Sequence, residues 1–355
     1  MPFFYDLDRL PPGENPARAA AGLIRLRAQL DRDIPAKTVT DRLLVATWNI
    51  QRLGGLARLA ESGLYIAEIL SRFDLIAIQE VRADLTALDD LRALLGPWWR
   101  YVVTDVTAGK AGNGERLAYL YDTRKLRFGG LAGEIVLPPV TDAAGETRPA
   151  AQLVRTPFLA GFNSGWFDFM IATVHLLYGK NAAGHPPRVE EVRQIASFLA
   201  GRTKERGAWS RNLILLGDFN IYEPDGPAFA ALTAAGFVID DALTGLPKTN
   251  IGKKARHYDQ IAFLFRDRRG LRPTAAGVLD FYDSVYRADQ RGAYAPEMGP
   301  ALTHTRKGRA RTAREQKTYY ESGWRARQMS DHLLMWVELP VEFADAYLQG
   351  RATPA

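Results

Sequence analysis

The sequence predicts one α/β domain preceded by a helical N-terminal arm, and two observations support this fold class. Short apolar runs of strand length recur from Leu43 to Leu339, and most of them end in or beside polar residues. Stretches with helical spacing lie between several of these runs. The chain has 355 residues, of which 47% are hydrophobic and 24% are charged, so it can bury a large core. We find no internal repeat and no clean linker.

The first element is a helix in the N-terminal arm. Asn15 followed by Pro16 fits an N-cap and a first helical position, and Leu23, Leu26 and Leu30 have helical spacing. We therefore expect a helix over Ala17 to Leu30. Residues 1–40 are predicted to form a helical extension, and residues 41–345 are predicted to form the main domain.

The main domain begins with a change to strand-like patterns. The predicted buried strands are Leu43 to Ile50, Leu75 to Val81, Leu117 to Tyr121, Phe167 to His175, Leu213 to Asn220, Ile261 to Phe265 and Leu333 to Leu339. Helices are expected at about Leu64 to Arg72 and Arg188 to Leu199. The remainder is interpreted as loop, including Thr104 to Gly114, Leu137 to Pro149 and a long basic insert at about residues 282–328.

Composition excludes several classes of protein. No apolar run reaches the roughly 18 residues that a membrane-spanning helix needs. The first ten residues contain two aspartates and one arginine, a poor match to a signal peptide. The absence of cysteine excludes disulfides, thiol catalysis and cysteine–zinc sites, and we expect a cytoplasmic protein. A net charge of +6 is compatible with a polyanionic partner.

Polar side chains recur at the ends of the predicted strands. Any one of them alone is explained by a solvated strand end or a structural histidine, but recurrence across six strands favours a site. Carboxylates with carboxamides suit a hard cation such as Mg²⁺ or Mn²⁺, which prefers oxygen ligands. The residues are Asn49, Gln51, Glu80, Glu115, Arg116, His175, Asp218, Asn220, Asp259, Asp331 and His332.

Five segments, in this order, resemble the signature blocks of the endonuclease/exonuclease/phosphatase superfamily. They are Thr47-Trp48-Asn49-Ile50-Gln51, Ile78-Gln79-Glu80-Val81-Arg82, Gly217-Asp218-Phe219-Asn220, Tyr258-Asp259-Gln260-Ile261 and Ser330-Asp331-His332. The resemblance covers about Leu43 to Leu339. It implies a four-layer sandwich, in which two mainly antiparallel sheets pack face to face between outer helices, and a catalytic role for residues 41–345.

Within the superfamily, the segments are most similar to the deoxyribonuclease I branch. Asn49 to Gln51, Gln79 to Arg82 and Glu115-Arg116 resemble segments of that enzyme. His175 stands where abasic-site endonucleases usually carry an asparagine, whereas sphingomyelinases and inositol-polyphosphate phosphatases also carry a histidine. The chain departs from deoxyribonuclease I in having no cysteine, in its N-terminal arm and in its basic insert.

The resemblance also implies residue roles. Glu80 would be the principal ligand of Mg²⁺ or Mn²⁺, with Asn49 and Asp331 close to the ion. Asp218 and Asn220 would orient water and phosphate. Two acid–base pairs would flank the scissile bond, in which Asp259 holds His332 and Glu115 holds His175. Substrate contacts are expected from Arg82, Arg116 and Asn49.

These observations predict a divalent-metal-dependent phosphodiester hydrolase, with a nucleic acid, DNA or alternatively RNA, as the expected substrate. A phosphatase or phospholipase-like phosphodiesterase for a small phosphorylated molecule or lipid headgroup is the alternative, and a non-catalytic binding module is a third hypothesis. Within the insert, eight cations would track a phosphate backbone, with Tyr319, Tyr320 or Trp324 available to stack on a base or sugar. These cations are Arg306, Lys307, Arg309, Arg311, Arg314, Lys317, Arg325 and Arg327. The alternative is a solvated loop whose charge only aids solubility. Further basic residues flank the Asp259 strand: Lys253, Lys254, Arg256, Arg266, Arg268, Arg269 and Arg272.

Overall fold

The computed structural model describes residues 2–179, 184–223, 225–252, 255–265 and 271–352. Lys253, Lys254, Arg266, Arg268 and Arg269, which we expected beside the site, lie outside the described residues. Within the described part of the chain, no helix is long and apolar enough to cross a membrane.

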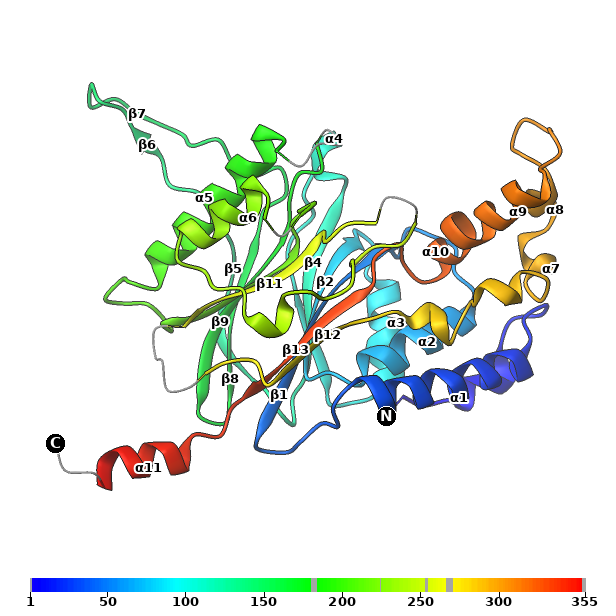
Figure 1. The fold of residues 1–355 in the computed structure, drawn as a ribbon, viewed down its shortest axis with the longest axis horizontal. Coiled ribbons are helices and arrows are strands. Elements are labelled where there is room, and N and C mark those ends of the chain that lie inside the picture. Colours follow the sequence, from blue (N-terminus) through cyan, green and yellow to red (C-terminus); the bar gives the residue numbers. More distant parts are fainter. Residues whose placement is uncertain (1, 180–183, 224, 253–254, 266–270, 353–355) are drawn as a thin grey trace.

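Two sheets form the centre of the molecule (Figure 1). The first has the order β12-β13-β1-β2-β4-β3. Its strands are β1 (Arg42–Leu53), β2 (Leu75–Arg82), β3 (Trp99–Val103), β4 (Glu115–Asp122), β12 (Ala275–Leu279) and β13 (Leu334–Pro340). The second has the order β11-β10-β9-β8-β5. Its strands are β5 (Arg127–Glu134), β8 (Phe158–Ser164), β9 (Phe167–His175), β10 (Asn212–Asp218) and β11 (Asp259–Phe265).

Most neighbouring strands are antiparallel, while β1 pairs with β2 and β9 pairs with β10 in parallel. The two sheets face each other across one apolar layer. Leu43 and Val45 of β1 belong to the same buried cluster as Ile214 and Leu216 of β10. Because strand side chains alternate, the next residues along β1 point to the outer face and pack beneath helices.

Helices cover both outer faces (Figure 1). α1 (Pro16–Asp33), α2 (Ala60–Leu70) and α3 (Thr86–Leu95) cover the first sheet, and α5 (Pro186–Arg202) and α6 (Pro227–Ala234) cover the second. The α/β four-layer sandwich implied by the family resemblance is therefore confirmed. The α1 helix is capped as expected, because the Asn15 side chain accepts a hydrogen bond from the Arg18 N–H at 3.0 Å.

The N-terminal arm contributes to the main core. Leu26 and Leu30 are fully buried and Leu23 is 4% exposed, all in the cluster that includes β1 and α2. The division of the chain at residue 40 remains a prediction, but α1 packs as a structural layer of the domain.

The interpretation of the basic insert as a loop is wrong. It contains short helices: η3 (Phe281–Asp283), η4 (Ala288–Arg291), α7 (Ala295–Met298), α8 (Pro300–Thr303), α9 (Ala313–Tyr319), a π-helical turn labelled η5 (Tyr320–Trp324) and α10 (Arg325–Gln328). They are too short to be stable alone, so packing against the rest of the protein must hold them. Arg18 of α1 contributes, because it pairs with Glu297 at 2.5 Å and lies 4.0 Å from the centre of the Tyr294 ring.

Two aromatic residues predicted to face a substrate are buried in this insert. Tyr320 is 0% exposed and packs on Tyr294, and Trp324 is 5% exposed and packs on Tyr286 and Tyr294. The prediction that they stack on a base is therefore wrong. Tyr319 remains partly exposed, and its ring lies 4.7 Å from the Arg311 guanidinium and 5.5 Å from that of Arg327.

The remaining elements lie outside the layers. The predicted loop Leu137 to Pro149 contains a ribbon of β6 (Val140–Thr141) and β7 (Thr147–Arg148), which projects from the molecule (Figure 1). The predicted loop Thr104 to Gly114 contains α4 (Gly109–Gly112). The other short elements are η1 (Tyr5–Arg9), η2 (Asp241–Leu243) and α11 (Ala344–Ala352).

Candidate active site

Strand register brings three predicted residues to one level of the second sheet. Asp218, the last residue of β10, pairs with His175 at the end of the parallel strand β9. Asp218 also pairs with Asp259 at the start of the antiparallel strand β11. Their side chains therefore gather at one edge of this sheet. Gly217 permits this approach, because a Cβ there would lie 2.2 Å from the Val174 carbonyl oxygen.

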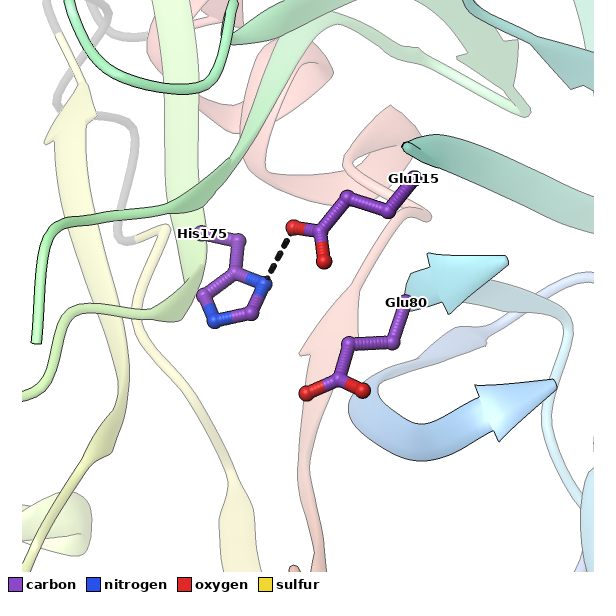
Figure 2. Close-up of side chains that lie close together, drawn as sticks. All are labelled: Glu80, Glu115 and His175. Atoms are coloured by element: carbon purple, nitrogen blue, oxygen red, sulfur yellow. Dashed lines mark ion pairs between the residues drawn. The ribbon is translucent and has the colours of Figure 1, made fainter. Parts of the chain in front are cut away.

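Glu115 of the first sheet and His175 of the second form a buried pair (Figure 2). The Glu115 carboxylate lies 2.6 Å from His175 Nδ1 and 2.6 Å from the Nε atom of Arg155. Burial opposes ionisation of both members, but each charge stabilises the other. The pKa of His175 is therefore raised and the pKa of Glu115 is lowered.

Asp259 and His332 form the second buried pair, with 2.9 Å between Asp259 Oδ2 and His332 Nδ1. Burial disfavours the imidazolium, but the Asp259 carboxylate outweighs it and raises the pKa of His332 well above its usual value. Both contacts predicted between a carboxylate and a histidine are present. In each pair the carboxylate faces Nδ1 and leaves Nε2 directed elsewhere.

Asp218 lies between the two histidines. Its Oδ2 atom is 3.5 Å from His175 Nε2 and 3.7 Å from His332 Nε2. Asn49 donates from Nδ2 to this same oxygen at 3.1 Å and also to Glu80 at 3.1 Å. Asn49 therefore connects the first sheet to the second at the centre of the site.

The backbone is unusual at two of these positions. Glu80 has φ 61° and Asn220 has φ 51°, a region that side-chain-bearing residues seldom adopt. Glu80 lies where the β2 register is interrupted on both sides, so the bulge turns it out of the ladder. The Arg52 N–H donates to Glu80 at 3.0 Å and holds this carboxylate.

The predicted strand Leu213 to Asn220 is shorter than expected, because β10 ends at Asp218. The Asn220 backbone N–H instead donates to Asp218 Oδ1 at 2.9 Å. Its side-chain amide donates to the Leu176 carbonyl at 2.9 Å, which ties the two strand ends together.

The residues present fit a divalent cation. Glu80, Glu115 and His175 form one group of possible ligand atoms, and Asp218, Asp259 and His332 form another, each within 4.8 Å. The Asn49 Oδ1 atom is buried with no hydrogen-bond partner in the described structure, so an acceptor is open to a cation. Burial, together with the neighbouring Glu80 and Asp218, raises the pKa of Asp331, and a cation would relieve this crowding of negative charge.

Two arginines predicted to contact the substrate are held by backbone carbonyls. Arg82 donates to the Asn113 carbonyl at 2.6 Å, and Arg116 donates to the Thr104 carbonyl at 2.7 Å. Conversely, sequence reasoning missed Arg155, which contacts Glu115 and also approaches the carbonyls of His175 and Leu176 at 3.4 Å. It also gave no role to Ser330, whose hydroxyl donates to the Asn49 carbonyl at 2.6 Å.

Together, the fold and the site define a four-layer α/β sandwich with two buried histidine–carboxylate pairs where its sheets meet. Residues 46–332 match the Endonuclease/Exonuclease/phosphatase family, and the chain belongs to this family. A curated relative, a protein named Deoxyribonuclease from Thioalkalivibrio sp., is 29% identical over 234 residues. That match covers 64% of this chain and 59% of the relative, so the chain spans less than two thirds of the relative's length.

Solved structures share the fold at low identity. TDP2 of D. rerio, in a complex with a single-stranded DNA product, superposes with a TM-score of 0.51 and 14% identity, over 84% of this chain and 98% of that chain. A mannosyl-6-phosphatase of Bacteroides thetaiotaomicron superposes with a TM-score of 0.51 and 19% identity, over 84% and 99% of the two chains. The family resemblance drawn from the sequence is confirmed.

Proposed function

We propose that this protein is a nuclease that cleaves phosphodiester bonds of DNA, or alternatively RNA, with Mg²⁺ or Mn²⁺. The observation that carries the proposal is the arrangement of two buried histidine–carboxylate pairs on either side of Asp218, next to Glu80. Phosphodiester hydrolysis needs a base for the attacking water, an acid for the leaving oxygen and positive charge at the phosphate.

Each of these needs has a residue in the site. Asp218 lies where it can orient a water between the two Nε2 atoms. His175 and His332 carry raised pKa values, which suits groups that hold a proton close to a leaving oxygen. Arg155 supplies a fixed positive charge beside the Glu115–His175 pair.

We assign Glu80, Asn49 and Asp331 to the cation, with Glu80 as the principal ligand. The bound ion would neutralise negative charge on the phosphate oxygens. Glu80 suits this role because its bulged backbone directs the carboxylate into the space beside His175, as Figure 2 shows. The open Oδ1 atom of Asn49 is a second oxygen for the same ion.

A nucleic acid is the favoured substrate for two reasons. The curated relative is named Deoxyribonuclease, and the insert carries exposed cations on a helical frame, among them Arg306, Lys307, Arg314 and Lys317. A polyanion is bound through many such cations, whereas a small phosphate ester engages few of them.

The test is a substrate panel with and without metal. Purified protein is incubated with Mg²⁺ or Mn²⁺ and plasmid, single-stranded DNA, RNA, sugar phosphates, inositol phosphates or sphingomyelin. We expect cleavage of nucleic acids and its loss in excess chelator. Glu80→Gln should lower turnover by roughly 10²-fold or more, whereas Asp90→Asn, at an exposed carboxylate on α3, should not. Preferential hydrolysis of a small ester would replace the nuclease assignment with the phosphatase alternative.

A further inference from the structure

Three tyrosines gather beside the candidate active site. The ring centres of Tyr222 and Tyr258 are 5.6 Å apart, and that of Tyr178 lies 6.4 Å and 6.1 Å from these two. Tyr258 precedes Asp259 in the chain, and its ring lies 5.9 Å from the His332 ring. The aromatic group is therefore in direct contact with one of the proposed acid–base residues.

Two arginines add positive charge to this group. The guanidinium of Arg188 lies 4.7 Å from the centre of the Tyr222 ring, and that of Arg256 lies 5.5 Å from it. Burial, followed by hydrogen bonding with Tyr178, raises the pKa of both Tyr222 and Tyr258. Both hydroxyls are neutral at physiological pH. Arg188 is fully buried, so the partly exposed Arg256 is the arginine of this pair that can face a phosphate strand.

Tyr178 differs from the other two tyrosines in its exposure. It is 42% exposed, compared with 5% for Tyr222 and 8% for Tyr258. Its two neighbours pack against it in tilted and edge-on geometries and leave part of the residue open to solvent. An aromatic side chain in this position presents a surface on which another ring can stack.

The backbone that carries Tyr178 is fixed to the site. Arg188 donates to the Tyr178 carbonyl at 2.7 Å, and the Leu177 N–H donates to the buried carboxylate of Glu191 at 2.7 Å. One residue earlier, the Leu176 carbonyl accepts from Asn220. The exposed ring is thus held three residues from His175 rather than on a free loop.

We propose that Tyr178 is a stacking platform for an unpaired nucleobase next to the scissile phosphate. The inference rests on the proposed nuclease function and narrows its substrate to single-stranded nucleic acid or unpaired segments. In a paired duplex each base is already stacked within the helix, so a protein ring can reach a base only where pairing is absent. A sugar phosphate or a lipid headgroup has no aromatic ring to stack on this surface.

An exposed tryptophan far from the candidate active site, Trp166, provides a control. Trp166 is 52% exposed and lies in the turn between β8 and β9, at the opposite end of β9 from His175. Its ring packs on Tyr347 of α11. Replacing Trp166 therefore removes an exposed ring of comparable accessibility far from the reacting centre.

The test uses a single-stranded oligonucleotide with one cleavable phosphodiester, the other linkages being methylphosphonates. It is prepared with bases on both sides of that linkage, or with an abasic residue on one side. On the oligonucleotide that carries a base on both sides of the cleavable linkage, Tyr178→Ala should lower kcat/KM by about 5- to 100-fold. This is the range expected for one base–aromatic stack. Tyr178→Phe and Tyr178→Trp should retain activity, and Trp166→Ala should not change it.

The abasic substrates distinguish stacking from a general structural effect. With the base missing on the stacked side, the wild type should already be slower, and Tyr178→Ala should have little further effect. An equal loss for Tyr178→Ala on all substrates, or no loss on any, would overturn the platform while leaving the nuclease assignment intact. A wild type that cleaves plasmid DNA but none of these oligonucleotides would overturn the platform alone. A wild type that cleaves no nucleic acid would overturn the nuclease assignment, and the platform with it.

Discussion

Asp218 is the residue at which the two histidine–carboxylate pairs meet, and both imidazoles present Nε2 to the same carboxylate oxygen. Three negative groups and two imidazoles therefore share one buried space. The protonation of each depends on its neighbours, so removing one partner changes the behaviour of the others. This coupling can be measured through the stability of the protein.

The Asp259–His332 pair should make stability depend on pH. His332 has a raised pKa in the folded state, so the stability from its protonation is fully present below the ordinary value of 6.5. It is lost as the pH rises through the higher folded-state pKa. We expect the free energy of unfolding to decline over this range in the wild type and to decline less in Asp259→Asn.

Urea unfolding in the presence of chelator, at pH values between about 6 and about 9, measures this difference. Chelator keeps metal binding from contributing to the slope. Parallel pH profiles for the wild type and Asp259→Asn would show that the carboxylate does not raise the pKa of His332.

Arg155 gives a prediction about turnover. Its guanidinium lies 2.6 Å from Glu115, at the edge of the site where a phosphate would carry negative charge. Removing one fixed donor of this kind typically costs about 10²- to 10³-fold in turnover. Arg155→Ala should therefore lower kcat strongly, while Arg193→Ala, at an exposed arginine paired with Glu190 on α5, should have no effect. Steady-state kinetics on one oligonucleotide decides between these outcomes.

The strand-end residues could be predicted from sequence because each follows a recognisable apolar run. Arg155 could not, since it follows a proline-punctuated segment and reaches Glu115 only through the folded path of the chain. Arg82 and Arg116 remain predicted substrate contacts that the structure does not place among the buried pairs. They stand near Glu80 and Glu115 in sequence, but Arg116 is one position along a strand from Glu115, and alternation sends its side chain to the other face.

At the scale of single elements, α1 and the insert depend on each other. Arg18 pairs with Glu61 of α2 and Glu297 of α7, and the Gln29 side chain donates to the Asp280 carbonyl. Two segments that lie far apart in the sequence thus form one layer over the first sheet (Figure 1). The helical arm and the insert, which both depart from deoxyribonuclease I, are parts of one structure.

A pair of substitutions on α1 tests this layer. Leu26 is fully buried, and replacing it with alanine should destabilise the fold by about 2–5 kcal/mol. Ile24 lies on the same helix but is 70% exposed, and Ile24→Ala should change stability by less than about 0.5 kcal/mol. Chemical denaturation measures both. Equal effects of the two substitutions would mean that α1 does not pack as described.

The helices of the insert were not predictable because their cause is not local. Most have four to seven residues, and helices that short are not stable alone. They are stabilised by a cluster of aromatic side chains, Tyr286, Tyr294, Tyr320 and Trp324. In the sequence these four residues are separated by charged residues, so they do not form a recognisable apolar run. In contrast, the predicted strand Phe167 to His175 has the observed bounds, because its apolar run is itself the buried layer.

At the scale of the whole molecule, charge distribution should control affinity for long substrates. The net charge is +6, and Arg306, Lys307 and Arg314 lie exposed on the insert. Replacing these three with serine should weaken binding to single-stranded DNA. It should also flatten the salt dependence by up to about 0.7 in log–log slope for each phosphate that the protein no longer neutralises.

Binding is measured at several salt concentrations in a Glu80→Gln background, so that the substrate is not cleaved. Cleavage of a dinucleotide by the same triple variant with Glu80 intact should be nearly unchanged, because the insert cations are not part of the reacting centre. An unchanged slope would remove the insert from the binding surface.

The strand order has a consequence for how the protein is made. β13, near the end of the chain, pairs with β1, near its beginning, and His332 lies just before β13. Glu115 and His175 come from different sheets, so neither sheet alone assembles even one complete pair. A ribosome-bound chain therefore holds no finished centre until its last strand has emerged and closed the first sheet. For the proposed nuclease, this topology would keep the growing chain inert beside the messenger RNA from which it is being translated.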